Sequence, residues 1–198
     1  MTRDVRVCVV GDSFVNGYGD PKALGWLGRV TARTPTGEMA LTVYELGVRG
    51  DSSADVLARW RGETARRFVP TAENRLVVAV GRHDLAQGLS LARTRLNLAN
   101  IVDDATTGGL RPFVVGLAPS LDPATNEQLK PLVAAQQDVC SRRNIPFVDC
   151  FTPLLGHEQW YADLAAGDGT HPGQAGYGLL AWLVLHTGWG SWLGVDTT

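Results

Sequence analysis

Five short apolar runs alternate along this chain with segments in which apolar residues recur at helical spacing. The runs are residues 5–10, 41–46, 76–80, 112–117 and 145–148. Each run is brief and rich in β-branched or aromatic residues, which is typical of parallel strands covered on both faces. Strands that alternate with helices favour right-handed crossovers. We therefore predict an α/β fold: three α/β/α layers around a five-stranded, parallel, doubly wound sheet of flavodoxin-like order 2-1-3-4-5.

The chain is predicted to form a single domain over residues 1–198, because no repeat, low-complexity segment or long Pro/Gly/Ser linker divides it. Its 44% hydrophobic and 19% charged residues are ordinary for a globular protein. The formal net charge is -2, and the lysines and arginines are scattered rather than striped. This pattern predicts no basic patch that would bind nucleic acid or an anionic membrane. We therefore expect a small, roughly neutral substrate and no stable membrane insertion. The sequence predicts no particular oligomeric state.

Three cysteines, Cys8, Cys140 and Cys150, fall in or beside predicted strands and a helix. Buried free thiols are the simplest interpretation, and they suit a reducing compartment. The stretch "MTRDVRVCVV" reaches the first predicted strand without an apolar segment and small-residue cleavage site, so we expect a cytoplasmic protein. Near the other end, Trp189 and Trp192 are interpreted as an aromatic plug over the sheet, with a dimer contact as the alternative.

Four glycine-containing stretches lie where polar groups from separate parts of the chain are expected to meet. They are "GDSF" at 11–14, "GVRGDSS" at 47–53, "GRHD" at 81–84 and "DGTHP" at 168–172. The first three follow predicted strands, and the last precedes the final predicted helix. In a doubly wound sheet such loops converge on the rim at the carboxyl ends of the strands, where ligands bind.

These loops contain the parts of an acyl-transfer site. Ser13 supplies a hydroxyl that becomes nucleophilic when a base removes its proton; His171 is the candidate base, and Asp168 the candidate partner of the second imidazole nitrogen. The amides of Ser13 and Gly47 are candidate donors to the oxygen of a tetrahedral intermediate. Taken singly, each stretch has a structural alternative, because Gly-Asp-Ser also forms turns and helix caps, and the residues around Asp168 also form a turn before a helix.

With these motifs in this order, the sequence resembles the SGNH or GDSL hydrolase superfamily, that is, the GDSL-like lipases and acylhydrolases, from Gly11 to about Tyr177. The resemblance implies that Ser13 is the nucleophile and that Asp168 and His171 are the acid and the base. It also implies that Gly47 belongs to the oxyanion hole. The expected activity is that of a serine esterase.

The third motif departs from the family pattern, which reads Gly-x-Asn-Asp where this chain has "GRHD". The imidazole of His83 therefore stands in place of the asparagine amide. Two interpretations remain open: His83 substitutes as an oxyanion donor, neutral or protonated, or it packs in the loop and leaves two backbone donors. Loss of one oxyanion donor typically lowers turnover about 10²- to 10³-fold. A catalytically impaired ligand-binding protein on the same scaffold is therefore the alternative function.

Other site chemistries find less support in the sequence. No pair of His or Cys residues has metal-ligand spacing, and no phosphate-binding or dinucleotide motif opens a helix, so neither a metal nor a cofactor is expected. Asp12 and Asp84 are interpreted as loop organisers, and His157 and His186 as structural or surface groups.

We expect small or short-chain acyl esters as substrates, because a polypeptide of 198 residues leaves few residues to form a lid over the site. Residues 16–27 and 157–166 are the segments expected to shape the pocket. His171 must be neutral to act as a base, so the rate is expected to fall as the pH drops into the range where histidine becomes protonated.

Overall fold

The computed structural model describes residues 2–195 and contains, within that range, a five-stranded sheet whose strands all run parallel. The strands are β1 (Arg3–Gly11), β2 (Met39–Gly47), β3 (Glu73–Ala79), β4 (Arg111–Val115) and β5 (Phe147–Val148). Their spatial order is β2-β1-β3-β4-β5, which confirms the predicted order. The register pairs Gly11 with both Gly47 and Ala79, so β1, β2 and β3 end at the same level.

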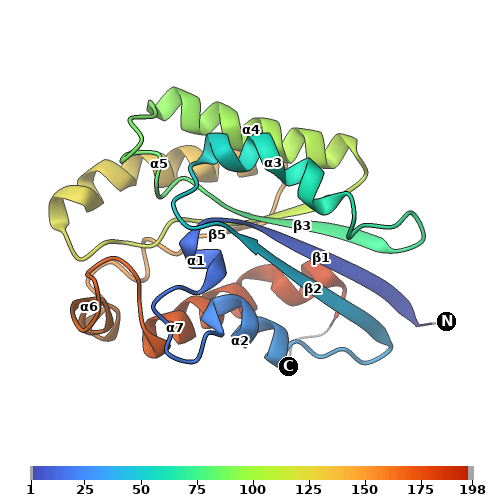
Figure 1. The fold of residues 1–198 in the computed structure, drawn as a ribbon. Coiled ribbons are helices and arrows are strands. Elements are labelled where there is room, and N and C mark those ends of the chain that lie inside the picture. The colour runs from blue at the N-terminus through green and yellow to red at the C-terminus, as the bar shows by residue number, and fades with distance from the viewer. Residues whose placement is uncertain (1, 196–198) are drawn as a thin grey trace.

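Helices cover both faces of this sheet (Figure 1), as predicted for a three-layer fold. One layer contains α3 (Ser53–Thr64), α4 (Leu91–Thr107) and α5 (Pro123–Ser141). The other contains α2 (Gly25–Arg33), α7 (Gln174–Val184), η1 (Leu185–Trp189) and α8 (Gly190–Leu193). Two short helices, α1 (Ser13–Asn16) and α6 (Glu158–Ala165), lie toward the carboxyl ends of the strands (Figure 1). Among residues 2–195, no helix has the length and apolar character needed to cross a membrane.

Side chains of β1 alternate between the two helical layers, as a strand buried on both faces requires. Val7 and Val9 belong to the core cluster that includes Trp26 of α2. Cys8 and Val10 point the other way, into the cluster formed with α3, α4 and α5. All four β1 side chains are fully shielded from solvent. The apolar run that predicted this strand therefore supplies both halves of the core.

The two edge strands differ from the prediction that every strand is covered on both faces. Along β2 only Met39 and Leu46 are buried and the other positions are partly or fully exposed, because β2 is an edge strand that pairs with β1 on one side only. β5 has only two residues, although the apolar run predicted a strand over 145–148. The Ile145 amide instead donates to Cys140 O at 3.0 Å and closes the turn after α5. Pro146 has no N–H to contribute to a ladder, so regular pairing begins only after it.

Trp189 and Trp192 form the predicted plug over the sheet. Their ring centroids lie 5.7 and 5.1 Å from that of Phe113 on β4. Trp189 is fully buried, and its indole N–H donates to Thr34 Oγ1 at 2.9 Å. The carboxyl-terminal segment therefore belongs to the core of the layer that contains α2 and α7.

All three cysteines are buried and free, as the sequence predicted. Burial raises the pKa of both the Cys8 and Cys140 thiols to about 12. The thiolate is the reactive form of cysteine, so these groups are inert packing residues.

Candidate active site

Ser13 lies at the turn where β1 passes directly into α1. The carboxylate of Asp12 caps the helix and accepts from the Phe14 amide at 2.9 Å. Gly11 is needed for the close approach of the neighbouring strand, because a Cβ there would lie 2.2 Å from Ala79 O. The local sequence thus holds the Ser13 hydroxyl at the carboxyl edge of the sheet, where the sequence predicted it.

Asp168 and His171 lie in the loop between α6 and α7 and meet Ser13 there. Asp168 Oδ1 accepts hydrogen bonds from the amides of Thr170 at 2.9 Å and His171 at 2.7 Å. Its Oδ2 lies 2.7 Å from His171 Nδ1. On the other side of the ring, His171 Nε2 lies 2.8 Å from Ser13 Oγ. The structure therefore brings together the three residues that the sequence singled out, in the order hydroxyl, imidazole, carboxylate.

The electrostatics of this loop favour an ionised Asp168. Burial pushes the pKa of its carboxyl upward, but hydrogen bonds from the His171 amide, the His171 ring and the Thr170 amide outweigh burial and lower that pKa to about 2. An ionised carboxylate accepts a hydrogen bond from Nδ1–H. This contact fixes the tautomer in which Nε2 of His171 is free to take a proton from Ser13.

Asp12 and Asp84 organise the loops that carry the site, as predicted. Asp84 has no exposed surface, and its carboxylate accepts from the Ser53 amide at 2.7 Å and from the Ser53 and Thr94 hydroxyls at 2.6 and 2.5 Å. These bonds tie the loop after β3 to the starts of α3 and α4. Burial raises the pKa of Asp12, while the Phe14 amide and nearby basic side chains oppose that rise.

His83 reaches the nucleophile from the loop after β3. Its Nε2 lies 3.5 Å from Ser13 Oγ, so two imidazoles face the same hydroxyl, with that of His171 the closer at 2.8 Å. A separation of 3.5 Å is at the outer limit of a hydrogen bond. The ring is nevertheless directed at the reacting group, and this supports the interpretation of His83 as a donor over that of a loop-packing residue.

Close packing of its loop accounts for the glycine at position 47. A Cβ at this position would lie 2.5 Å from Asn16 N and 2.6 Å from Asp12 O, so glycine is required because the loop packs against α1. Its N–H already donates to Glu45 Oε1 at 3.3 Å. The sterically open glycine of this loop is Gly50, which has φ +88° and nothing within 4 Å of the position that a Cβ would occupy.

Aromatic side chains from the segment after Ser13 surround the imidazole of His171. The ring centroid of Phe14 lies 5.5 Å from that of His171, and Tyr18 meets the imidazole edge-on at 4.8 Å. The guanidinium carbon of Arg49 lies 3.4 Å from the centre of the Tyr18 ring. Tyr18 and Arg49 are both exposed. They form the outer rim of the site beside the imidazole.

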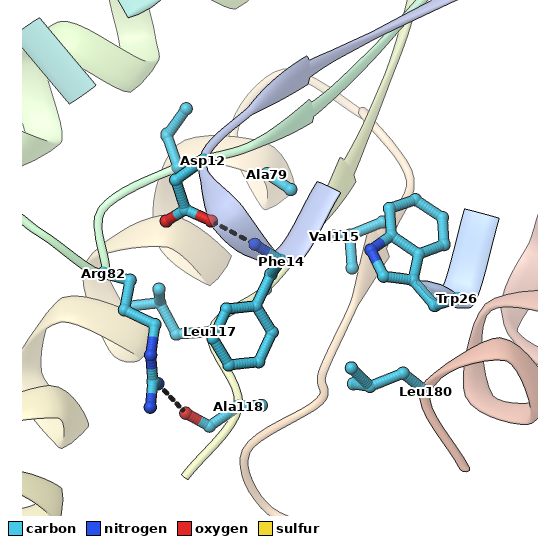
Figure 2. A pocket seen from close by; sticks show the side chains of 11 residues that line it. Asp12, Phe14, Trp26, Ala79, Arg82, Val115, Leu117, Ala118 and Leu180 are labelled. Atoms are coloured by element: carbon cyan, nitrogen blue, oxygen red, sulfur yellow. Dashed lines mark hydrogen bonds between the residues drawn. The ribbon is translucent and has the colours of Figure 1, made fainter. Parts of the chain in front are cut away.

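A small cavity lies beside Phe14 and is lined by Trp26, Leu180 and Arg82 among other residues (Figure 2). Its volume is about 30 Å³, and neither Ser13 nor His171 lines it. A cavity of this size holds one or two water molecules and is too small for an acyl chain.

Comparisons with known proteins agree with this geometry. A family model described as the GDSL-like Lipase/Acylhydrolase family matches residues 9–179. The chain belongs to this family. It is accordingly an esterase or acylhydrolase, a carboxylic ester hydrolase of the GDSL type.

Individual relatives of this GDSL hydrolase are esterases by name. Esterase TesA of Pseudomonas aeruginosa is 26% identical over 169 residues, which cover 84% of this chain and 79% of that protein. The crystal structure of TesA superposes with a TM-score of 0.75 at 25% identity and covers 92% of this chain and 97% of that chain. Axe2, an acetylxylan esterase from Geobacillus stearothermophilus, superposes with a TM-score of 0.76 at 19% identity, covering 98% and 97% of the two chains. The latter likeness concerns the fold.

The other histidines of the GDSL hydrolase lie outside the site, as predicted. His157 caps α6, where its Nδ1 accepts from the Trp160 amide at 3.4 Å. His186 is exposed and lies with Nδ1 2.7 Å from Trp182 O. Across residues 2–195, no group of three or more His, Cys, Asp or Glu side chains is arranged to hold a metal ion.

Arg82 lies at the site of this GDSL hydrolase, although its position in the sequence did not single it out. The guanidinium carbon of Arg82 lies 4.5 Å from the centre of the Phe14 ring, and Nη1 donates to Ala118 O at 2.8 Å (Figure 2). The signal in the sequence was a cation directly before His83 in a strand-end motif. It was read only as the variable position of Gly-x-Asn-Asp.

Proposed function

We propose that this protein hydrolyses carboxylic esters through a Ser13–His171–Asp168 triad. His171 Nε2 takes the hydroxyl proton as Ser13 Oγ attacks the acyl carbon, and a tetrahedral oxyanion forms. Collapse of the intermediate breaks the ester C–O bond, and His171 gives the proton to the departing alcohol. Water, deprotonated by His171, then attacks the acyl-enzyme, so that the carboxylic acid leaves and Ser13 is restored. The observation that carries the proposal is the 2.8 Å approach of His171 Nε2 to Ser13 Oγ.

We assign the oxyanion hole to the Ser13 amide, His83 Nε2 and an amide from the loop that contains residues 47–50. His83 takes the place of the family's asparagine, and its 3.5 Å distance from Ser13 Oγ supports this role. Gly47 serves only if its N–H releases the Glu45 carboxylate, since both cannot bind the same donor.

We propose that the substrates are small or short-chain acyl esters. Two observations support this class. The enclosed cavity next to Phe14 has room for water only, so it does not accept a long chain. The acid of the triad also lies at an open edge, with 48% of the Asp168 side chain exposed.

A catalytically impaired ligand-binding protein is the second candidate, and the exchange of asparagine for His83 is the observation that favours it. The two candidates differ in the state of Ser13. An activated serine reacts covalently with a fluorophosphonate, whereas the serine of a passive pocket does not.

The deciding experiment is labelling of the purified protein with a fluorophosphonate probe, together with hydrolysis of nitrophenyl esters of increasing acyl length. The expected result is one adduct on the peptide that contains Ser13, and rates that fall as the acyl chain lengthens. Ser13→Ala should lose both labelling and hydrolysis. Ser191→Ala is the matched control, because this serine is exposed and bonds only Gly188 O among the described residues. A folded wild-type protein that neither labels nor hydrolyses any ester of the series would favour the binding protein.

The three buried free thiols suit a reducing compartment, and on that basis we propose a cytoplasmic location. The whole chain is proposed to act as a single domain.

A further inference from the structure

Arg82 connects three loops at the carboxyl edge of the sheet. It lies in the loop after β3, directly before His83. Its Nη1 donates to Ala118 O, in the loop after β4, at 2.8 Å. Its Nη2 donates to Thr170 O at 3.4 Å. Thr170 lies between Asp168 and His171, so this bond reaches the loop that carries both the acid and the base. Figure 2 shows the side chain extended alongside Phe14, with its guanidinium end at Ala118.

Phe14 links the same guanidinium to the imidazole. Arg82 Cζ lies 4.5 Å from the centre of the Phe14 ring, and that ring lies 5.5 Å from the ring of His171. A cation over an aromatic ring is attracted by the negative ring face. Arg82 therefore supports His171 by two routes: through the backbone at Thr170 and through the ring of the residue that follows Ser13.

Burial of the Arg82 guanidinium is unfavourable for its positive charge. Burial lowers the pKa of Arg82, while the nearby negative charges of Asp12 and Asp168 favour its charged form. Its Nε is buried and finds no hydrogen-bond partner among residues 2–195. Such an unpaired buried donor lowers the stability of the fold. What sets Arg82 apart from other buried arginines is that its guanidinium bonds two loops of the site.

We propose that Arg82 is a positioning residue that holds the loop of residues 168–171 so that His171 Nε2 stays within reach of Ser13 Oγ. The inference rests on the proposed function of the triad. A planar guanidinium suits this task, because its fork serves two carbonyl oxygens in different loops while its face rests on Phe14. An ammonium group lacks both the fork and the flat face, so lysine should replace arginine only in part.

The first test compares Arg82→Met and Arg82→Lys with Arg75→Met. Arg75 is a matched control: it is buried, its Nε is likewise unpaired within residues 2–195, and it donates to the backbone carbonyls of Trp192 and Leu193. It lies far from Ser13, in the first half of β3. We expect Arg82→Met to lower kcat about 10- to 100-fold with KM changed less than about threefold, since misplacing a catalytic group by an ångström costs this much. Arg82→Lys should fall between Arg82→Met and wild type, and Arg75→Met should keep the wild-type kcat per folded molecule.

The second test is chemical rescue. Arg82→Ala removes the guanidinium and leaves space beside a cavity that is already present, while the partial exposure of residue 82 gives solutes access. Added guanidinium or methylguanidinium at non-denaturing concentration should raise the kcat of Arg82→Ala at least about fivefold. The same solute should leave Arg75→Ala unchanged. A residue that only stabilises the fold would show no such selective rescue.

The third test does not depend on catalysis. The amides of Thr170 and His171 are held by Asp168 Oδ1, so their hydrogen exchange reports on the order of the loop. We expect NMR to show exchange at these two amides about tenfold faster in Arg82→Met than in Arg75→Met, as loss of one charge-assisted bond implies.

These measurements separate the inference from the function on which it rests. If wild type fails to label at Ser13, the proposed hydrolase fails, and the exchange measurement still decides the role of Arg82. An active wild type with Arg82→Met at wild-type kcat, or exchange at Thr170 and His171 that is equal in the two Met variants, would overturn the positioning role.

Discussion

Ser13 Oγ lies 2.8 Å from His171 Nε2, although 158 positions of sequence separate the two residues. The contact is made because β1 ends at Gly11 and the loop before α7 returns to the same edge of the sheet. Neither side chain is positioned by its sequence neighbours alone. The site is therefore a product of the strand order, and variants that loosen either loop should lower activity without changing the fold.

Asp168→Asn should lower kcat about 10⁴-fold, the loss typical of a triad whose orienting carboxylate becomes an amide. An amide nitrogen can donate to Nδ1, and this would place the proton on Nε2, where His171 has to be unprotonated. Steady-state kinetics with a nitrophenyl ester measures the loss. Asp122→Asn serves as the control, since Asp122 is an exposed helix cap that asparagine replaces about equally well, and its change should leave kcat unchanged. Full activity in Asp168→Asn would rule out the orienting role.

His83→Ala should lower kcat at least about tenfold, because it removes one donor to the oxyanion. His83→Asn should retain more activity than the alanine variant, since it restores the amide that the family pattern carries at this position. The measurement is kcat for the three proteins on one ester. A rate in His83→Ala equal to that of wild type would show that the ring packs in the loop, and that backbone donors suffice.

The value of kcat/KM should fall as the pH drops from about 8 to about 5, because His171 can accept the Ser13 proton only while its Nε2 is unprotonated. The pKa of Asp168 is lowered to about 2, so its carboxylate stays ionised through this range and adds no second acid limb. Nε2 of His83 also faces Ser13 Oγ, so the profile should be measured in His83→Asn as well as in wild type. A profile that stays flat between pH 5 and 8 would contradict the mechanism.

The sheet and the place of Ser13 at its edge were predictable because both depend on apolar runs in the sequence, whereas Asp168 and His171 follow no strand and were singled out by their motif before the final predicted helix. Short apolar runs mark buried strands, and the ends of parallel strands meet at one edge, so polar residues placed after those runs must converge. The role of Gly47 was not predictable in this way, because it depends on how closely its loop approaches Asn16. The contacts of Arg82 were not predictable either, since its partners Ala118 and Thr170 belong to loops that only the folded chain brings near it.

The stability of the protein should depend on pH through Glu73, which pairs with Arg3 and with the buried Arg75. The hydrogen bond from Arg3 lowers the pKa of Glu73, burial raises it, and the hydrogen bond from Arg75 lowers it further. The net result is a pKa lowered from 4.5 to about 2. The folded state therefore keeps Glu73 ionised at pH values where the unfolded chain binds a proton, and its contribution is complete above about pH 4.5 and lost as the pH falls toward 2.

Glu73→Gln should accordingly lower the free energy of unfolding by about 1 kcal/mol at pH 7, a modest value because 40% of the Glu73 side chain is exposed. At pH 3 the difference between variant and wild type should shrink to less than about half of that. Urea unfolding at the two pH values measures both. Glu127→Gln is the control, because its pair with Lys130 is exposed and should contribute almost nothing at either pH. An equal penalty for Glu73→Gln at pH 7 and pH 3 would mean that the ion pairs with Arg3 and Arg75 do not stabilise the fold.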